Sequence, residues 1–437
     1  MISSNFSKTA IDKLGVRIRT NGGFKEACCQ NDLQLLQDYR LSHKNSLKEV
    51  FNVLSMYSKS LQKGRLRIVS FRVKKIETII SKLKRLPKMR LVQMGDIAGC
   101  RCVLQNDKMV YELKNTLCKH FNVEEKKVND RIKNPSEDGY KAIHLYVKPK
   151  NVNNPKIIEI QIRTLEQHNW STFVEIIDVM YGIKIKEGDK SKPKLNKFLK
   201  LYSEVSSAEL KDKLELIEIE KEHKIYSEML EIFSPNLIKL REIWMNMEGY
   251  STRDSFLIFE VNKSTKVSNV KVYQSFEEAE NVYFSNFTNS ETDILVTQLD
   301  VNNFNQLSIA YANYFLTNHS FQDTWHNLLN ELIRELYEKK EYNKLKMVYK
   351  LYKYIVEEEH ALFEKELMFI DKEYQPETSN ISKVLKINKW ITEQTQAHED
   401  RMEEFKTLEK YIDIDELDAI SVFFSSIWNK TIGKWIF

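Results

Sequence analysis

The sequence has few cysteines, no long apolar run and none of the common glycine-rich phosphate-binding motifs. Its five Cys in 437 residues form no C-x-x-C metal spacing, and their odd number argues against a disulfide framework. No apolar stretch reaches the length of a transmembrane helix, and the N-terminal residues lack the hydrophobic core of a signal peptide. We therefore expect reduced cysteines, no membrane contact and a cytoplasmic location. Without a Walker A sequence or G-x-G-x-x-G, a P-loop, kinase or dinucleotide-binding fold is not expected.

Length and charge indicate more than one globular domain and an uneven charge distribution. A chain of 437 residues exceeds what one hydrophobic core usually organises, and 42% hydrophobic with 30% charged residues is typical of a globular protein. The formal net charge is only +5, but residues 63–90 carry eleven Lys and Arg against one acidic residue, Glu77. Such a basic block either attracts the phosphates of a nucleotide or nucleic acid, or is a solvated helix face.

Alternating residues at 157–164 predict a β-strand with two chemically different faces. Ile158, Ile160 and Ile162 point one way, whereas the side chains between them are a carboxylate, an amide and a guanidinium. These polar residues are Glu159, Gln161 and Arg163. A helix that carries His168 follows. Polar groups of this kind on one open face suggest a site rather than an ordinary wet surface.

Three more predicted strands bring charged or hydrogen-bonding groups. They cover residues 69–74, which run into a helix, residues 99–104 and residues 143–148. The candidate site residues near them are Arg72, Lys74 and Lys82 for the first, Asp96 and Arg101 for the second, and Tyr140, Lys141 and His144 for the third. Arg72 and Lys74 lie just before a helix N-terminus, where free N–H groups also favour an anion. Taken singly, each of these residues is explained equally well without a functional site, the Lys and Arg as surface cations and Asp96 as a capping residue.

Two carboxylates among these cations suit a site for magnesium and a polyphosphate. Mg²⁺ typically takes one or two protein carboxylates, here Asp96 and Glu159, and completes its octahedron with phosphate oxygens and water. The neighbouring Lys and Arg neutralise the remaining phosphate charge, and an aromatic side chain such as Tyr140 stacks on a base.

With these motifs in order, residues 45–182 resemble the synthetase domain of the RelA/SpoT family, of the small alarmone synthetase kind. The resemblance rests on FRVKKIETIISKL, GDIAGCRCVL, GYKAIHL, IIEIQIRT and QHNW. It implies an α/β (α+β) fold with a mixed β-sheet, a nucleotidyltransferase-like synthetase domain flanked by helices. It also implies an ATP-dependent pyrophosphokinase that moves the β,γ-pyrophosphate of ATP onto the 3′-hydroxyl of GDP or GTP, making (p)ppGpp.

The resemblance further implies a role for each candidate residue. On the ATP side, Arg72 and Lys74 would hold the phosphates, Arg72 and Arg101 would flank the adenine, and Lys82 would add a further cation. Mg²⁺ would be bound by Asp96 and Glu159, with Glu159 also activating the acceptor hydroxyl. The acceptor side would be lined by Tyr140, Lys141, His144, Gln161, Arg163 and His168, with Tyr140 stacked on the acceptor base. At position 141 many members of the family carry Arg, whereas this chain carries Lys. Lys keeps the positive charge but cannot form the two parallel hydrogen bonds of a guanidinium.

Two other functions stay open on the sequence. Some toxic members of this family transfer pyrophosphate to the 3′ end of tRNA, and the basic block at 63–90 suits an RNA backbone. A non-catalytic nucleotide sensor or RNA-binding regulator is the third alternative, which the two retained carboxylates disfavour.

The second half of the chain is predicted to be largely helical around a small mixed unit. We expect a synthetase domain at 1–187, a helical linker region at 188–250, a small α/β unit at 251–320 and a helical C-terminal region at 321–437. A long helix is expected over 210–233, interrupted by Pro235. No recognisable catalytic motif lies in this half. Three roles stay open for this half: homo-oligomer contacts, binding of an antitoxin or other regulatory partner, and neutralisation of the positive charge of the basic half.

Overall fold

The computed structural model of the chain contains two compact units. It describes residues 7–412 apart from 21–29, 63–66, 184, 186–188, 190, 246–254, 263–267, 287–291, 300–306, 308–309, 311–318 and 374–380. The first unit combines residues 1–203 with 239–320, and the second combines 204–238 with 321–437. The chain thus leaves the first unit and later returns to it.

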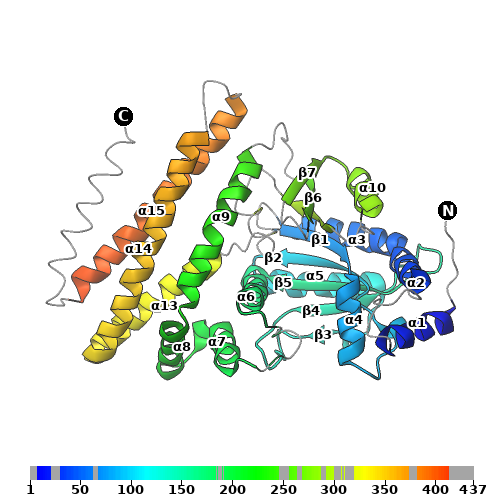
Figure 1. The fold of residues 1–437 in the computed structure, drawn as a ribbon, viewed down its shortest axis with the longest axis horizontal. Helices are drawn as coiled ribbons and strands as arrows, with labels where there is room; N and C mark the ends of the chain where they lie inside the picture. The colour runs from blue at the N-terminus through cyan, green and yellow to red at the C-terminus, as the bar shows by residue number, and fades with distance from the viewer. Residues whose placement is uncertain are drawn as a thin grey trace. The chain divides into compact units, whose positions relative to one another are not determined.

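The first unit is built on a mixed eight-stranded sheet (Figure 1). The strands are β1 (Arg67–Val73), β2 (Ala98–Leu104), β3 (Asn129–Asp130), β4 (Ile143–Val147), β5 (Ile158–Thr164), β6 (Ser255–Asn262), β7 (Ser268–Tyr273) and β8 (Thr292–Leu299). Their order in the sheet is β3-β4-β5-β2-β1-β8-β6-β7. The pair β2 and β5 is parallel, whereas β1 runs antiparallel to both of its neighbours. The predicted α/β class, with a mixed sheet flanked by helices, is confirmed.

One face of this sheet is the hydrophobic core of the unit. Alternate strand residues such as Phe71, Cys100 and Ile160 are buried there against helices α3 (Lys44–Gln62), α5 (Asp107–Phe121) and α10 (Phe276–Asn286). Burying one large apolar side chain contributes about 1.5–3 kcal/mol, so this face fixes the register of the strands. The residues between these core positions are directed to the opposite face.

Strands β6, β7 and β8 extend the same sheet, whereas the sequence analysis expects them in a unit of their own. β8 pairs with β1, with Ser70 opposite Thr297 and Phe71 opposite Val296. The apolar face of β1 is thereby continued by Val296, which is buried in the same core. An open strand edge next to an apolar face favours such pairing. The other proposed domain boundaries stay predictions.

Further helices surround the sheet of the first unit. They are α1 (Lys8–Thr20), α2 (Gln30–Leu41), α4 (Ile76–Arg85), α6 (Leu165–Tyr181) and α7 (Pro193–Ser203), with short 3₁₀ turns at Leu91–Gln93 and Glu125–Lys127. The apolar spacing within residues 32–63 predicts one helix, but the chain turns at Ser42 and His43 and forms the two helices α2 and α3. α6 begins with a capping box, in which Thr164 and Gln167 bond each other's backbone N–H.

The second unit is helical throughout its described residues. It contains a 3₁₀ turn at Val205–Ser207, α8 (Leu210–His223), the start of α9 (Ile225–Met245), nearly all of α13 (His319–Glu338), α14 (Tyr342–Glu373) and α15 (Ile381–Tyr411). The predicted interruption at Pro235 is wrong: α8 ends at Lys224, whose φ of 50° is left-handed, and Pro235 lies within α9. The helix expected at 305–315 lies largely outside the described residues. No helix in the described ranges is long and apolar enough to cross a membrane.

Candidate active site

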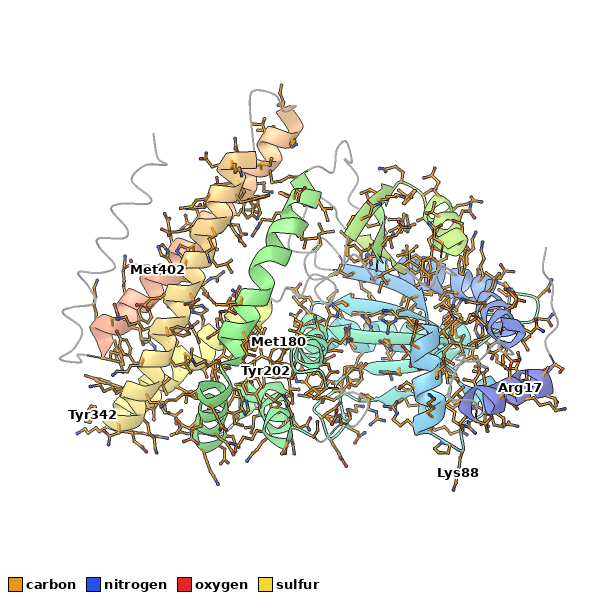
Figure 2. All side chains as sticks on the ribbon, viewed as in Figure 1. Arg17, Lys88, Met180, Tyr202, Tyr342 and Met402 are labelled. Carbon is orange, nitrogen blue, oxygen red and sulfur yellow. The ribbon has the colours of Figure 1, made fainter. Side chains whose placement is uncertain are left out.

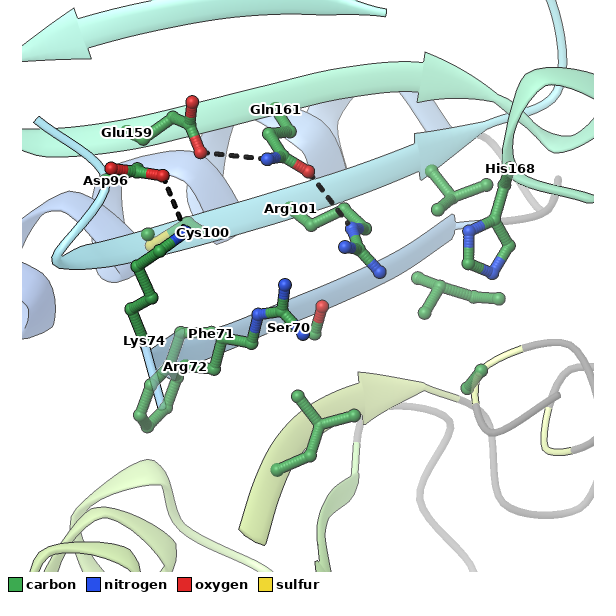
Figure 3. Close-up of a pocket in the computed structure, with 15 residues that line it drawn as sticks. Ser70, Phe71, Arg72, Lys74, Asp96, Cys100, Arg101, Glu159, Gln161 and His168 are labelled. Carbon is green, nitrogen blue, oxygen red and sulfur yellow. Dashed lines mark hydrogen bonds and ion pairs between the residues drawn. The ribbon is translucent and has the colours of Figure 1, made fainter. Parts of the chain in front are cut away.

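The face of the sheet opposite the core carries five of the twelve candidate residues in two rows across the strands. The first row runs through Tyr146 on β4, Glu159 on β5, Gly99 on β2 and Arg72 on β1. The second row, two residues along each strand, consists of His144, Gln161, Arg101 and Ser70. Residues two apart in a strand share a face, so the two rows are neighbours. Figure 3 shows Glu159 and Arg101 on adjoining strands, with Arg72 beyond them.

The members of the two rows on β5, β2 and β1 line a pocket. Seven of the twelve predicted site residues line it, namely Arg72, Lys74, Asp96, Arg101, Glu159, Gln161 and His168. Gly99 lies in the middle of the first row. A β-carbon there would be 3.1 Å from the carbonyl oxygen of Glu159, tighter than an ordinary contact. Glycine at this position therefore leaves space between Glu159 and Arg72.

Asp96 lies between two lysines at the entrance of β2. Nζ of Lys74 and Nζ of Lys82 are each 2.8 Å from Oδ2 of Asp96. Burial favours the neutral acid, but the two ammonium groups hold the pKa of Asp96 below its ordinary value. Burial also lowers the pKa of Lys74, although Asp96 opposes that change. Lys82 does not line the pocket itself, but its ammonium group pairs with Asp96, which does. A phosphate bound beside Asp96 would therefore be within reach of Lys82.

Glu159 is a buried carboxylate that accepts hydrogen bonds at both oxygens. Its Oε1 accepts from Tyr146 and contacts Nδ1 of His144, both at 2.9 Å, and its Oε2 accepts from Gln161 at 2.8 Å. Burial alone would raise the pKa of Glu159, but its interaction with His144, followed by the Gln161 hydrogen bond, leaves that pKa below the ordinary value. Glu159 therefore stays ionised at neutral pH.

The polar face of β5 is buried at Glu159 and Arg163 and half-buried at Gln161, which corrects the expectation of an open face. Glu159 is 7% exposed and Arg163 only 2%. The cover comes from other elements: His144 and Tyr146 of β4 contact Glu159, and His168 of α6 contacts Arg163. Burial, together with nearby Arg101, lowers the pKa of Arg163.

Tyr146 is a site residue that the sequence analysis missed. The alternation that directs His144 to the polar face of β4 directs Tyr146 there too, so the signal was present. Its ring also packs beside Gly95, where a β-carbon would lie 2.8 Å from a ring carbon of Tyr146. Tyr146 thus contacts Glu159 directly and also the segment that leads into Asp96.

The remaining predicted acceptor residues lie beside the pocket rather than in its lining. The Tyr140 hydroxyl is 2.9 Å from Nε2 of His144, and its ring lies 6.3 Å from that of Trp170. Lys141 donates from Nζ to the backbone oxygen of Ser203 at 3.3 Å. Tyr140 is linked to Glu159 through His144, but Lys141 and Arg163 are not brought to the pocket. The roles of these residues stay predictions.

The described part of the basic block, residues 67–90, is not one continuous surface around the pocket. Lys82 is engaged with Asp96, whereas Lys84, Arg85 and Lys88 are exposed. Figure 2 shows Lys88 beyond the end of α4, directed away from the sheet. An RNA backbone and a nucleotide would therefore use different members of this block.

The two carboxylates fit a magnesium ion that is shared with phosphate oxygens. No group of three or more His, Cys, Asp or Glu in the described ranges forms a complete protein site for a metal. Asp96 and Glu159 do line the same pocket, and two carboxylate oxygens leave positions for phosphate and water. The residues present therefore suit Mg²⁺ bound together with its nucleotide.

Comparison with known proteins agrees with this geometry. Residues 71–186 match the family described as the region found in RelA / SpoT proteins. An uncharacterized protein of Mycobacterium tuberculosis is 28% identical over 188 residues, 42% of this chain and 63% of that protein, so the match spans less than two thirds of that relative. The GTP pyrophosphokinase YwaC of Bacillus subtilis is 34% identical over 110 residues, 23% of this chain and 52% of that protein.

A solved structure is also similar to part of this chain. The crystal structure of small alarmone synthetase 2 from Bacillus subtilis is 28% identical, covers 43% of this chain and 98% of its own, and gives a TM-score of 0.33. Family match and site residues coincide on β1 to α6. Residues 71–186 of this chain are therefore a region of the kind found in RelA/SpoT proteins.

Proposed function

We propose that the first unit transfers the β,γ-pyrophosphate of ATP to the 3′-hydroxyl of GDP or GTP, making (p)ppGpp. The observation that carries this proposal is the pocket in which Asp96 and Glu159 are surrounded by Arg72, Lys74 and Arg101. The similarity to a protein named GTP pyrophosphokinase supports the same reaction class. Phosphoryl-type transfer depends on positioning and charge stabilisation, and this pocket supplies both.

The lysines would bind the donor phosphates. Both ammonium groups lie 2.8 Å from Asp96, so a phosphate near that carboxylate is within their reach after a small side-chain rotation. Magnesium held by Asp96 and Glu159 would neutralise phosphate charge and favour attack on the β-phosphorus. Arg72 lies on the same strand face and would hold the nucleoside end of ATP.

Glu159 would orient and deprotonate the attacking hydroxyl. It is ionised, and three neighbouring side chains fix its carboxylate before a substrate arrives. Gln161 is itself held by Arg101, whose Nε lies 3.4 Å from Oε1 of Gln161. A base that is already oriented costs little reorganisation at the moment of reaction.

A label-transfer experiment with the full chain tests the proposal. ATP labelled on the γ-phosphate is incubated with magnesium and with GDP, GTP or bulk tRNA, and the labelled product is identified. We expect label on the guanosine nucleotide and none with the Asp96→Asn variant. Label on tRNA alone would replace GDP or GTP by the tRNA 3′ end. ATP binding without transfer to any acceptor would favour a nucleotide-binding regulator.

A further inference from the structure

A strand outside the RelA/SpoT region contributes to the pocket. Leu295 of β8 and Ala310 line it together with Arg72 and Arg101, although the family match covers only residues 71–186. Both residues belong to the part of the first unit that the chain forms after its return at 239. The pocket is therefore completed by a segment that is no part of the matched region.

The register of β8 on β1 directs Leu295 to the pocket face. Phe71 lies opposite Val296, so the next pair along the two strands brings Leu295 opposite Arg72. Val296 and Phe71 are both in the core, and neighbouring strand residues point to opposite faces. Leu295 is 8% exposed. It extends the row of Tyr146, Glu159, Gly99 and Arg72 by one strand.

This row changes in chemistry from one end to the other. Carboxylates and ammonium groups lie near Asp96, where a polyphosphate is stabilised, whereas Leu295 offers an apolar surface beside the guanidinium of Arg72. A phosphate gains nothing from a leucine side chain. A purine base gains dispersion contacts from it and stacks on a guanidinium plane.

The position of β8 favours the donor base over the acceptor base. His144 and Tyr146 lie on β4, and three strands, β5, β2 and β1, separate β4 from β8. At about 4.8 Å per strand, the two ends of the row are roughly 19 Å apart. An acceptor held beside β4 therefore does not reach Leu295, whereas a nucleotide with its phosphates at Lys74 and its base over Arg72 does.

We infer that Leu295 is the wall of the donor purine pocket and limits the size of the base substituents that the pocket admits. This inference rests on the proposed function and adds a specificity residue to it. The matched control is Leu299. It is also a buried leucine of β8 on the same face, 1% exposed, but it does not line the pocket.

The test compares Leu295→Ala and Leu299→Ala with the unchanged chain. For each protein, kcat/KM is measured with ATP, N6-benzyl-ATP and 2-methylthio-ATP. We expect Leu295→Ala to raise the ratio of at least one bulky analogue to ATP by about tenfold or more, since one or two carbons in an apolar pocket change selectivity by that order. Leu299→Ala should leave every ratio within about twofold of the unchanged chain. Equal ratios in the two variants would overturn the inference.

Two further measurements distinguish a failure of the inference from misfolding of a variant and from a failure of the proposed function. Leu295→Phe, which narrows the pocket, should raise the KM of ATP and leave that of the acceptor unchanged, even if Leu295→Ala folds poorly. If the unchanged chain transfers no pyrophosphate, the proposed function fails. The same ratios are then measured as binding affinities of ATP and its two analogues. A failure of the unchanged chain to bind ATP would overturn the inference as well.

Discussion

The hydroxyl of Tyr146 donates a 2.9 Å hydrogen bond to the same oxygen of Glu159 that His144 contacts. Tyr146 and Glu159 are also direct cross-strand partners of β4 and β5. The hydrogen bond therefore follows from strand register, because directly opposite residues in an antiparallel pair lie within side-chain reach. It holds the carboxylate in one orientation without any ligand.

Replacing Tyr146 by Phe should slow turnover while leaving ATP affinity unchanged. A hydrogen bond to a charged group contributes about 1.5–3 kcal/mol, so we expect kcat to fall by roughly tenfold or more. A donor to the ionised form lowers a carboxyl pKa, so its loss should raise the pKa of Glu159 and move the acid limb of the pH–rate profile to higher pH. The control is Tyr111→Phe, since Tyr111 donates to Asp130 away from the pocket. An equal loss in both variants would contradict a positioning role.

Glu159→Gln should reduce pyrophosphate transfer to below about a tenth of the unchanged rate, a barrier change above ~1.4 kcal/mol, with ATP binding retained. The amide replaces an acceptor by an N–H₂ donor among three existing donors, so a lower melting temperature is also expected. Glu280→Gln serves as the control. Glu280 is equally buried but pairs with Lys48. Near-normal transfer by Glu159→Gln would show that its carboxylate is not needed.

Reversing the charge of Lys84, Arg85 and Lys88 should separate the two acceptors. These residues are exposed, and Lys82 is left unchanged because it contacts Asp96. If tRNA is the acceptor, the triple change to Glu should abolish its labelling and flatten the salt dependence of binding, since fewer phosphates are neutralised. With GDP or GTP as the acceptor, turnover should change little. We expect the second result, and loss of labelling confined to tRNA would refute it.

The stability of the second unit should decrease as pH rises from about 6.5 to 8. Burial raises the pKa of Glu359 from 4.5 to about 8, so folding favours its protonated form and loses that contribution as pH approaches 8. His326 contacts Glu359 at 2.7 Å, and burial lowers the pKa of His326 from 6.5 to about 3. Its effect is therefore confined to pH below 6.5.

Glu359→Gln should remove about half of this slope, because burial raises the pKa of Glu220 in the same unit to about 8 as well. The amide stays neutral at every pH but keeps the shape of the side chain beside Tyr226 and Arg401. Thermal unfolding of the full chain between pH 6 and 8, with hydrogen exchange in α14 to identify the transition, measures the effect. An unchanged slope in the variant would assign the pH dependence to other groups.

Local patterns predicted the strands of the site well and their surroundings poorly. Alternation at 158–163 correctly separated the isoleucines from Glu159 and Gln161, and Asp96 was placed at the entrance of a strand. Burial of Glu159 depends on β4 and that of Arg163 on α6, and alternation within β5 contains no information on either. The pairing of β8 with β1 joins segments far apart in sequence, so no local signal shows it.

Unusual backbone conformations were the other reason why helix boundaries were predicted wrongly. Proline is the usual signal for the end of a helix, yet Pro235 lies within α9. The actual break uses Lys224 in a left-handed conformation, which lysine rarely adopts and which its sequence context does not indicate.

The pairing of β8 with β1 also determines when the sheet can close during synthesis. β1 and β2 are complete once residue 104 has been made, but the other edge of β1 gains its partner only after residue 299. At about 5–20 residues per second, the ribosome needs roughly 10–40 s for that interval. Throughout it the nascent chain carries an unpaired strand edge beside apolar side chains. The nascent site also lacks Leu295, so the pocket is completed late in translation.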